Sequence, residues 1–199
     1  KTAIFQNPLY MPDKKAAEEA ALYLEQCMSQ KNSSGGVIEC VIHGMPAGVG
    51  DPVFEKLNAN LGKAVLSIGA IKGFEIGDGF SVAAATGLSN NDCYYADADK
   101  HIKKITNHAG GITGGISDGC DIIFRAAVKP TPSIAAAQQT INKNRENISV
   151  EIKGRHDPVI VPRAVVVVEA MAALTITDML FASMTAKLDD VVAFFKEKQ

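Results

Sequence analysis

The stretch from Asn107 to Gly119 constrains the fold most, because five of the ten residues from Gly110 to Gly119 are glycine. A residue without a Cβ adopts positive φ at little cost and lets the backbone approach a ligand closely. Successive N–H groups in such a turn form a concave site for anions. The stretch therefore predicts either an anion-binding loop or a pair of tight turns around a buried strand.

The residues after this loop predict a strand and then a stiff, cationic segment. From Cys120 to Val128, alternate residues are apolar and share one face, as expected of a strand. The segment that follows carries one cation and two hydroxyls on a backbone that two prolines stiffen, and consists of Lys129, Pro130, Thr131, Pro132 and Ser133. We expect loop, strand and segment to form one wall of a site for a phosphate-bearing cofactor.

Composition excludes several classes of protein. The 199 residues carry a net charge of −2 and contain no basic run, so nothing indicates binding to nucleic acid. Four cysteines without Cys-x-x-Cys spacing argue against a zinc site or a disulfide framework and suit a reducing compartment. The four histidines also lack metal-ligand spacing, so we expect no metal. No signal peptide is visible.

Apolar periodicity predicts three helices and a strand between the first two. Asp13 is the expected N-cap of the first helix, which ends near residues 32–36, and residues 37–42 form the strand. Asp51-Pro52 predicts the start of the second helix, with an apolar stripe that reaches Ile68. The third runs from Pro162 to about Lys187. Its apolar run contains two acidic residues, so we expect a helix buried in the core and no membrane span.

The remaining segments give weaker signals. Residues 81–107 are polar, and their acids Asp92, Asp97 and Asp99 suit either a cation site or, as we favour, a solvated loop. Residues 134–147 are ambiguous between loop and irregular strand. Ile148 and Val150 alternate with polar residues and predict a half-buried strand. Residues 188–199 form a charged tail or a short helix.

Three ionisable residues follow one another in the turn Gly154-Arg155-His156-Asp157-Pro158. An arginine offers a planar fork for phosphate or carboxylate, and a nearby carboxylate can take a proton. The alternative is a surface turn in which Arg155 and Asp157 pair with each other. The P-loop, the Gly-x-Gly-x-x-Gly fingerprint and the Gly-x-Ser-x-Gly elbow are all missing from the sequence.

These residues together resemble the chorismate synthase family. The matching motifs occur in the family's order over nearly the whole chain: Gln6-Asn7-Pro8 with Pro12-Asp13, Gly44-Met45-Pro46-Ala47-Gly48 through Asp51-Pro52-Val53-Phe54, Lys72-Gly73-Phe74-Glu75-Ile76-Gly77, Asn107-His108-Ala109-Gly110-Gly111, Gly114-Gly115-Ile116-Ser117, Ala127-Val128-Lys129-Pro130-Thr131, and Gly154-Arg155-His156-Asp157-Pro158 with Pro162-Arg163-Ala164-Val165.

The resemblance implies a lyase of the shikimate pathway of aromatic amino acid biosynthesis. The family forms chorismate by 1,4-anti-elimination of phosphate from 5-enolpyruvylshikimate 3-phosphate, and it requires reduced FMN although the reaction has no net redox change. The implied fold is α+β, a β-α-β sandwich with an antiparallel sheet core and outer helices. The resemblance further implies a cytoplasmic flavoprotein, usually a homotetramer, in which residues 1–199 lie in one domain.

The resemblance also implies the site residues. FMN contacts fall on Gly69, Ala70, Gly114, Lys129, Pro130, Thr131, Pro132, Ser133 and Arg155. Relatives often have asparagine where this chain has Gly69, so only backbone contacts carry over there. Asp157 matches an acidic residue near the reactive edge of the flavin, where it would assist proton removal.

The match is to the C-terminal portion of the family. The family's N-terminal half carries a Ser-His-Gly signature, a second functional histidine, an Arg-Ser-Ser flavin contact and most substrate-binding arginines, none of which is in this sequence. We therefore expect these 199 residues alone to be inactive, to expose apolar surface and to self-associate. The alternative is a truncated, non-catalytic fragment that folds or self-associates without enzyme activity.

Overall fold

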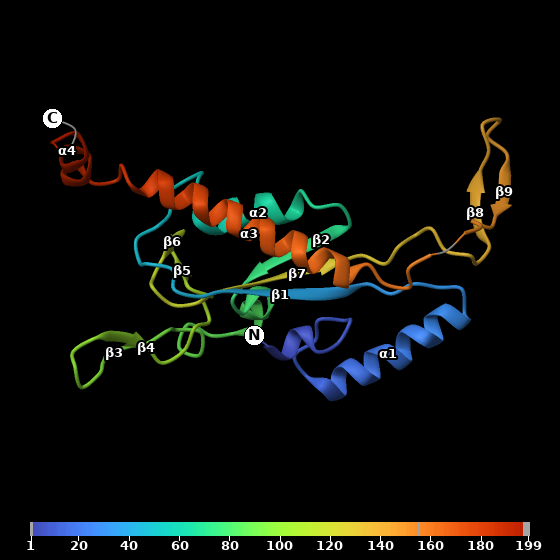
Figure 1. The fold of residues 1–199 in the computed structure, drawn as a ribbon, viewed down its shortest axis with the longest axis horizontal. Coiled ribbons are helices and arrows are strands. Elements are labelled where there is room, and N and C mark those ends of the chain that lie inside the picture. The colour runs from blue at the N-terminus through green and yellow to red at the C-terminus, as the bar shows by residue number, and fades with distance from the viewer. Residues whose placement is uncertain (1, 155, 197–199) are drawn as a thin grey trace. The chain divides into compact units, whose positions relative to one another are not determined.

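A computed structural model describes residues 2–154 and 156–196 of the chain. The chain divides into two compact units, Lys1–Ile38 with Ala127–Val167, and Glu39–Ala126 with Val168–Gln199. Figure 1 shows the elements in chain order.

The first unit begins with the 3-10 helix η1 (Thr2–Phe5) and the helix α1 (Lys14–Ser29). The Asp13 carboxylate accepts a hydrogen bond from the Ala16 amide at 2.9 Å, which confirms Asp13 as the N-cap. This helix buries only Ala17 and Cys27, and its large apolar side chains Leu22, Tyr23 and Met28 are exposed.

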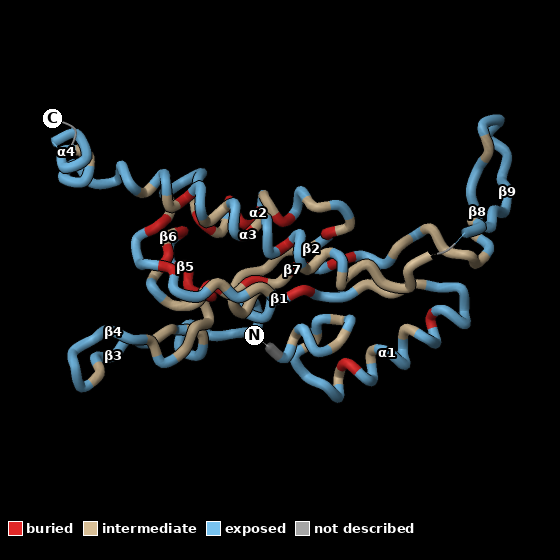
Figure 2. The backbone as a smooth tube through the Cα atoms, viewed as in Figure 1, coloured by how far each residue is buried: buried red, intermediate tan, exposed pale blue. Residues whose placement is uncertain are grey.

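Residues 134–150, ambiguous in sequence, contain an antiparallel hairpin of β8 (Gln138–Ile141) and β9 (Asn147–Val150). The Asn142 side chain accepts hydrogen bonds from the amides of Asn144 and Glu146 and so closes the turn. All four residues of β9 are exposed, so the prediction of a half-buried strand is wrong. The alternation of apolar and polar residues predicts the strand correctly, but it does not show whether another element covers the apolar face. Figure 2 shows β9 as exposed.

The sheet has the strand order β1 (Gly36–Ile42), β7 (Ile122–Val128), β2 (Ile71–Ile76). The strand predicted from Cys120 to Val128 is therefore its central strand, and three of the four residues on its apolar face, Ile122, Phe124 and Ala126, are fully buried. The Phe124 ring packs on Phe74, with centroids 5.4 Å apart. Alternation along β7 thus builds the core of the second unit.

The helix α2 (Leu57–Leu66) covers β2 and buries Leu57, Leu61 and Val65 completely. It does not begin at Asp51-Pro52, as the sequence predicts. Val53 has φ +74, which no α-helix accommodates. The helix begins where the Leu57 amide donates to the Gly115 carbonyl at 2.8 Å, so a distant turn sets its start in place of a local cap.

The long helix α3 (Val161–Ser183) begins beside Pro162 as predicted and ends before Lys187. By length and composition it could cross a membrane, although core helices of soluble proteins pass the same test. The expected burial is not met, because among the described residues only Val168, Ala172 and Met179 of this helix are buried. Large apolar side chains such as Phe181 stay exposed, as does most of the terminal helix α4 (Leu188–Lys196).

Short elements fill residues 79–117. They are the 3-10 helix η2 (Gly79–Ala84), the antiparallel hairpin β3 (Tyr94–Ala96) with β4 (Ile102–Lys104), and the antiparallel hairpin β5 (Ile112–Thr113) with β6 (Ile116–Ser117). Antiparallel pairs with separate helices confirm the α+β fold class.

The four cysteines, all within the described residues, are free. Burial, with a smaller contribution from the charge of Glu169, raises the pKa of the Cys40 thiol to about 11. Cys27 is buried, whereas Cys93 is exposed. These states agree with the prediction that no disulfide framework is present.

Phe124→Ala is expected to lower the free energy of unfolding by about 3–5 kcal/mol, because it leaves a cavity beside Phe74 in the core. Phe54→Ala is the matched control: Phe54 is 86% exposed, and its loss is expected to cost about 0.5 kcal/mol or less. Urea unfolding followed by circular dichroism measures both. Equal costs would show that β7 is not at the centre of the core.

Candidate functional site

The glycines of the stretch 107–119 meet two different structural demands. Gly114 and Gly115 form the two-residue turn of the β5–β6 hairpin with φ values of +64 and +91, and positive φ at both positions is typical of a type I′ turn. A Cβ at Gly110 would clash with the backbone of Gly77, and one at Gly111 with the carbonyl of Asp121. Tight turns and close backbone approach therefore account for these four glycines.

Gly114 differs from its neighbours because space opens beside it. No heavy atom lies within 4 Å of the position that a Cβ would take there, and the residue is exposed. By contrast, a Cβ on Gly115 would clash with the side-chain carbons of Lys56. Gly115 is thus required for packing, while Gly114 leaves its backbone open to a ligand.

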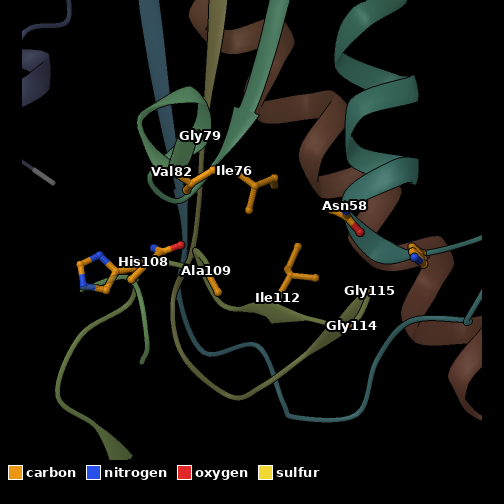
Figure 3. Close-up of a pocket in the computed structure, with 11 residues that line it drawn as sticks. Asn58, Ile76, Gly79, Val82, His108, Ala109, Ile112, Gly114 and Gly115 are labelled. Carbon is orange, nitrogen blue, oxygen red and sulfur yellow. The ribbon is translucent and has the colours of Figure 1, made fainter. Parts of the chain in front are cut away.

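A cavity of about 440 Å³ lies beside this turn, within the second unit (Figure 3). Its size falls in the range of about 300–1,000 Å³ typical of small-molecule sites. Figure 3 shows Ile76 and Ile112 between η2 and the start of α2. The lining mixes polar and apolar side chains with glycines, and consists of Lys56, Asn58, Ile76, Gly79, Val82, Asn90, His108, Ala109, Ile112, Gly114 and Gly115.

The polar side of the cavity is the N-terminal end of α2, where Lys56 and Asn58 lie. A helix N-terminus carries partial positive charge, and Lys56 adds a full one. The Oδ1 atom of Asn58 is buried and has no hydrogen-bond partner among the described residues. This side of the cavity therefore suits anionic and hydrogen-bonding groups of a ligand, while the isoleucines suit a flat apolar one.

A buried ion triad lies next to the loop. The Lys104 ammonium is 2.5 Å from an oxygen of Asp118 and 3.6 Å from one of Asp92, and the three side chains are only 3%, 8% and 8% exposed. The expectation that Asp92 lies in a solvated loop is wrong, because its side chain is largely buried. Its oxygens accept hydrogen bonds from the amides of His108 and Ala109 at 2.8 and 3.0 Å.

The pKa values of the triad follow from these contacts. Burial by itself raises the pKa of Asp92, but the hydrogen bonds it accepts and the charge of Lys104 outweigh burial and lower it to about 2. Burial likewise opposes the shift at Asp118, whose pKa is lowered by Lys104. Asp118 in turn raises the pKa of Lys104 against its burial. All three groups are therefore charged at neutral pH.

A second set of contacts fixes the loop to the end of β2. The His108 ring lies 2.6 Å from the Asp78 carboxylate, and the His108 carbonyl accepts from the Asp78 amide at 2.9 Å. The Gly77 carbonyl accepts from Arg125, whose guanidinium also pairs with Glu75 at 2.9 Å. Arg125, on the polar face of β7, thus fixes Gly77, the residue before the one that binds the loop at His108.

Two further acids, Asp97 and Asp99, lie in the β3–β4 turn. Asp97 accepts hydrogen bonds from the amides of Asp99 and His101, which closes the β3–β4 turn. Asp97, Asp99 and His101 are close enough together to hold an ion, but exposed acidic groups are common without one.

The other predicted contacts belong to the first unit. Ser33 donates to the Thr131 carbonyl at 2.7 Å, and the Ser34 amide donates to the Pro158 carbonyl at 2.7 Å. These two serines therefore hold segments 129–133 and 157–158 on one stretch of chain. Lys129 is exposed there, and Thr131 Oγ1 is buried without a hydrogen-bond partner among the described residues.

Asp157 pairs with Arg163, with oxygen-to-nitrogen distances of 2.8 and 3.3 Å. The sequence alternative in which it pairs with Arg155 falls outside the described residues, since Arg155 is not among them. The partner missed in the sequence lies six residues away, at the start of α3. Two contacts to one planar group fix the orientation of the carboxylate.

Gly69 and Ala70 precede β2 in the second unit. Ala70 has φ +72, a left-handed conformation that is uncommon for a residue with a Cβ, and nothing fills the space beside Gly69. The predicted contacts thus form two groups: Gly69, Ala70 and Gly114 in one unit, and Lys129–Ser133 with Asp157 in the other. Their convergence on one ligand stays a prediction.

Fold and site together define an α+β protein with a ligand-sized cavity at a glycine turn. A family model described as chorismate synthase matches residues 1–181. The chain therefore belongs to the chorismate synthase family.

Individual relatives agree. The chain is 61% identical to a chorismate synthase of Agathobacter rectalis over 98% of its own length and 53% of the relative's. It is 52% identical to one of Methanocaldococcus jannaschii over 89% of its length and 47% of the relative's. A solved structure described as the crystal structure of chorismate synthase superposes with a TM-score of 0.75 at 28% identity, covering 98% of this chain and 52% of that one. The chain spans about half the length of these relatives.

Acid is expected to weaken the fold through Asp92. Its pKa is about 2 in the folded chain against an ordinary 3.8, so its contribution to the free energy of unfolding is complete above about pH 4 and is lost as the pH falls toward 2. The loss is about 2 kcal/mol. Asp92→Asn is expected to remove this part of the pH dependence in urea unfolding. The control Asp99→Asn, in the exposed turn, retains it; a curve unchanged in Asp92→Asn would contradict the assignment.

Proposed function

We propose that this chain is the portion of a chorismate synthase that forms part of the flavin site and supplies a proton acceptor. The reaction is the 1,4-anti-elimination of phosphate from 5-enolpyruvylshikimate 3-phosphate to give chorismate, with reduced FMN. The observation that carries the proposal is the cavity beside Gly114, where the backbone is open to a ligand in a chain of this family.

The residues present fit FMN. The flavin is a flat, mainly apolar ring with polar edges, joined through a hydroxylated chain to a phosphate. Ile76 and Ile112 suit the ring, while Lys56 and the unpaired amide oxygen of Asn58 suit its polar groups. When bound, reduced FMN supplies electron density to the substrate as phosphate leaves and regains it as a C–H bond breaks.

The segment Lys129–Ser133 would hold the phosphate side of the cofactor, together with Arg155. Lys129 offers an exposed ammonium, and the two prolines keep the segment from rearranging. The Thr131 hydroxyl is buried and lacks a hydrogen-bond partner in the described chain, so it has a free donor and acceptor for a ligand. Gly69, Ala70 and Gly114 would contribute backbone contacts.

Asp157 would accept the proton that the substrate loses. Arg163 engages both carboxylate oxygens, but each oxygen has a second lone pair that remains available. Arg163 therefore orients the carboxylate without blocking it. We assign Asp157 to catalysis and Arg163 to positioning.

The longer protein completes the enzyme in this proposal. Large apolar side chains of α3 and α4 are exposed, among them Leu174 and Phe181, and a partner surface would cover them. We propose that both units belong to one domain, since a single family model spans them. A cytoplasmic homotetramer is proposed from the family resemblance alone. The 199 residues alone are expected not to release phosphate. Sequencing the upstream coding region separates this reading from a natural fragment without activity.

Gly114→Ala is expected to weaken FMN binding about tenfold or more, because the added methyl group enters the space beside the turn. Gly44→Ala is a matched control: Gly44 also has positive φ, +75, and open space beside it, but it does not line the cavity. Both substitutions are expected to cost about 1–2 kcal/mol of stability from backbone strain. Fluorescence titration with FMN measures affinity in the natural polypeptide that carries this sequence, and equal affinities would reject the site.

Asp157→Asn and Lys129→Ala are expected to give opposite patterns in that polypeptide. Asp157→Asn lowers the rate of phosphate release with reduced FMN about 100-fold or more and leaves FMN affinity intact, because a proton acceptor is lost. Lys129→Ala weakens FMN binding about tenfold, because a charged contact to phosphate is lost. Lys143→Ala, on the exposed β8–β9 turn, is the control for a lost cation. Weakened binding in Asp157→Asn with normal turnover at saturating FMN would reverse the assigned roles.

A further inference from the structure

We propose that Lys104 is a positioning residue that holds the loop from Thr106 to Cys120 in the conformation in which Gly114 borders the cavity. The link from loop to flavin rests on the proposed function, whereas the positioning of the loop stands on contacts within the second unit.

Burial makes Lys104 unusual. Its side chain is 3% exposed, and lysine is almost never fully buried unless it is paired. Its ammonium lies between two carboxylates and 5.3 Å from the centre of the Tyr94 ring. Replacing a buried ion pair by apolar residues is often neutral or stabilising, so stability alone does not explain three buried charges.

The first carboxylate holds the beginning of the loop. Asp92 Oδ1 accepts hydrogen bonds from the Thr106 hydroxyl and the His108 amide, both at 2.8 Å. Its Oδ2 accepts from the Ala109 amide at 3.0 Å and faces Lys104. Two consecutive backbone amides are thus fixed by one side chain, just before the first glycine of the run.

The second carboxylate holds the end of the loop. Asp118 accepts hydrogen bonds from the Cys120 amide at 3.0 Å and from the Thr113 hydroxyl at 3.1 Å. Its own amide donates to the Gly111 carbonyl at 3.1 Å. The Gly114-Gly115 turn lies between these anchors, so its position follows from where the two carboxylates are held.

Lys104 is the group that the two anchors share. Like charges in a buried site repel, and one ammonium compensates both. Without it, a carboxylate must take up a proton or turn to solvent. The first change weakens the hydrogen bonds that it accepts from the loop amides, and the second breaks them. Lys104 therefore acts on the cavity through Asp92 and Asp118 and does not line it.

The test uses Lys104→Met and Lys104→Arg in the natural polypeptide that carries this sequence. Lys104→Met keeps an unbranched apolar side chain and removes the charge, while Lys104→Arg keeps the charge. Lys103→Met is the matched control, since Lys103 pairs with Asp97 in the exposed turn of the same hairpin. Amide hydrogen exchange without flavin reports on the loop, and FMN titration reports on the cavity.

Lys104→Met is expected to raise the exchange of the His108, Ala109 and Cys120 amides at least tenfold, while that of the β7 amides from Phe124 to Val128 stays unchanged. The Ile123 amide is not a reference, because it donates to the Gly110 carbonyl in the loop. FMN affinity is expected to fall about tenfold. Lys104→Arg is expected to restore part of both effects, and Lys103→Met to change neither.

Unchanged exchange at the three loop amides would overturn the proposal. So would an equal rise at the β7 amides from Phe124 to Val128, because it would show a general loss of stability. If Lys104→Met does not fold, Asp118→Ala removes the acceptor of the Cys120 amide and leaves the charges of Lys104 and Asp92 paired. It is expected to raise the exchange of the Cys120 amide alone, and unchanged exchange there would also overturn the proposal. If exchange rises only at the loop amides but the wild-type protein does not bind FMN, loop positioning is supported and the proposed function is rejected. A local rise with unchanged FMN affinity would reject the link between the two.

Discussion

Close approach between backbones is the constraint on which the second unit depends. Gly77 lies against the loop at His108 and Gly110, and Gly111 lies against Asp121, with no room for a Cβ at any of these glycines. The loop is thereby joined to the ends of β2 and β7. Backbone amides beside these glycines donate to side chains that are distant in sequence: those of His108 and Ala109 donate to Asp92.

Those distant residues are charged, and their burial has an energetic consequence. Breaking a buried ion pair by removing one partner costs about 3–5 kcal/mol, whereas an exposed pair contributes about 0–1 kcal/mol. The Lys104 triad is of the first kind, and pairs such as Lys14 with Glu18 on α1 are of the second. Charge pairing therefore matters more at the loop than in the exposed pairs of α1.

Local features were predictable from the sequence. The cap at Asp13, the buried face of β7 and the start of the long helix each depend on residues within a few positions of one another. Ordered motifs also predicted the family, because several matches in sequence order are far more specific than one.

Long-range features were not predictable in the same way. The start of α2 is set by Gly115, more than fifty residues away in the chain, and the Lys104 triad joins residues 12–14 positions apart that show no periodic pattern. The exposure of α3 and β9 depends on what covers them, and composition carries no information about that. The convergence of the two groups of predicted flavin contacts is likewise a matter of how distant segments pack.

The cysteines give the chain a selective point for chemical attachment. With a pKa of about 11, roughly one Cys40 in 10⁴ is a thiolate at pH 7, and thiolates are the reactive form. Cys27 is buried, and the pKa of Cys120 is raised by burial and by Asp118. An alkylating dye would thus react first with exposed Cys93, so that a single label can be attached to the chain without any engineered cysteine.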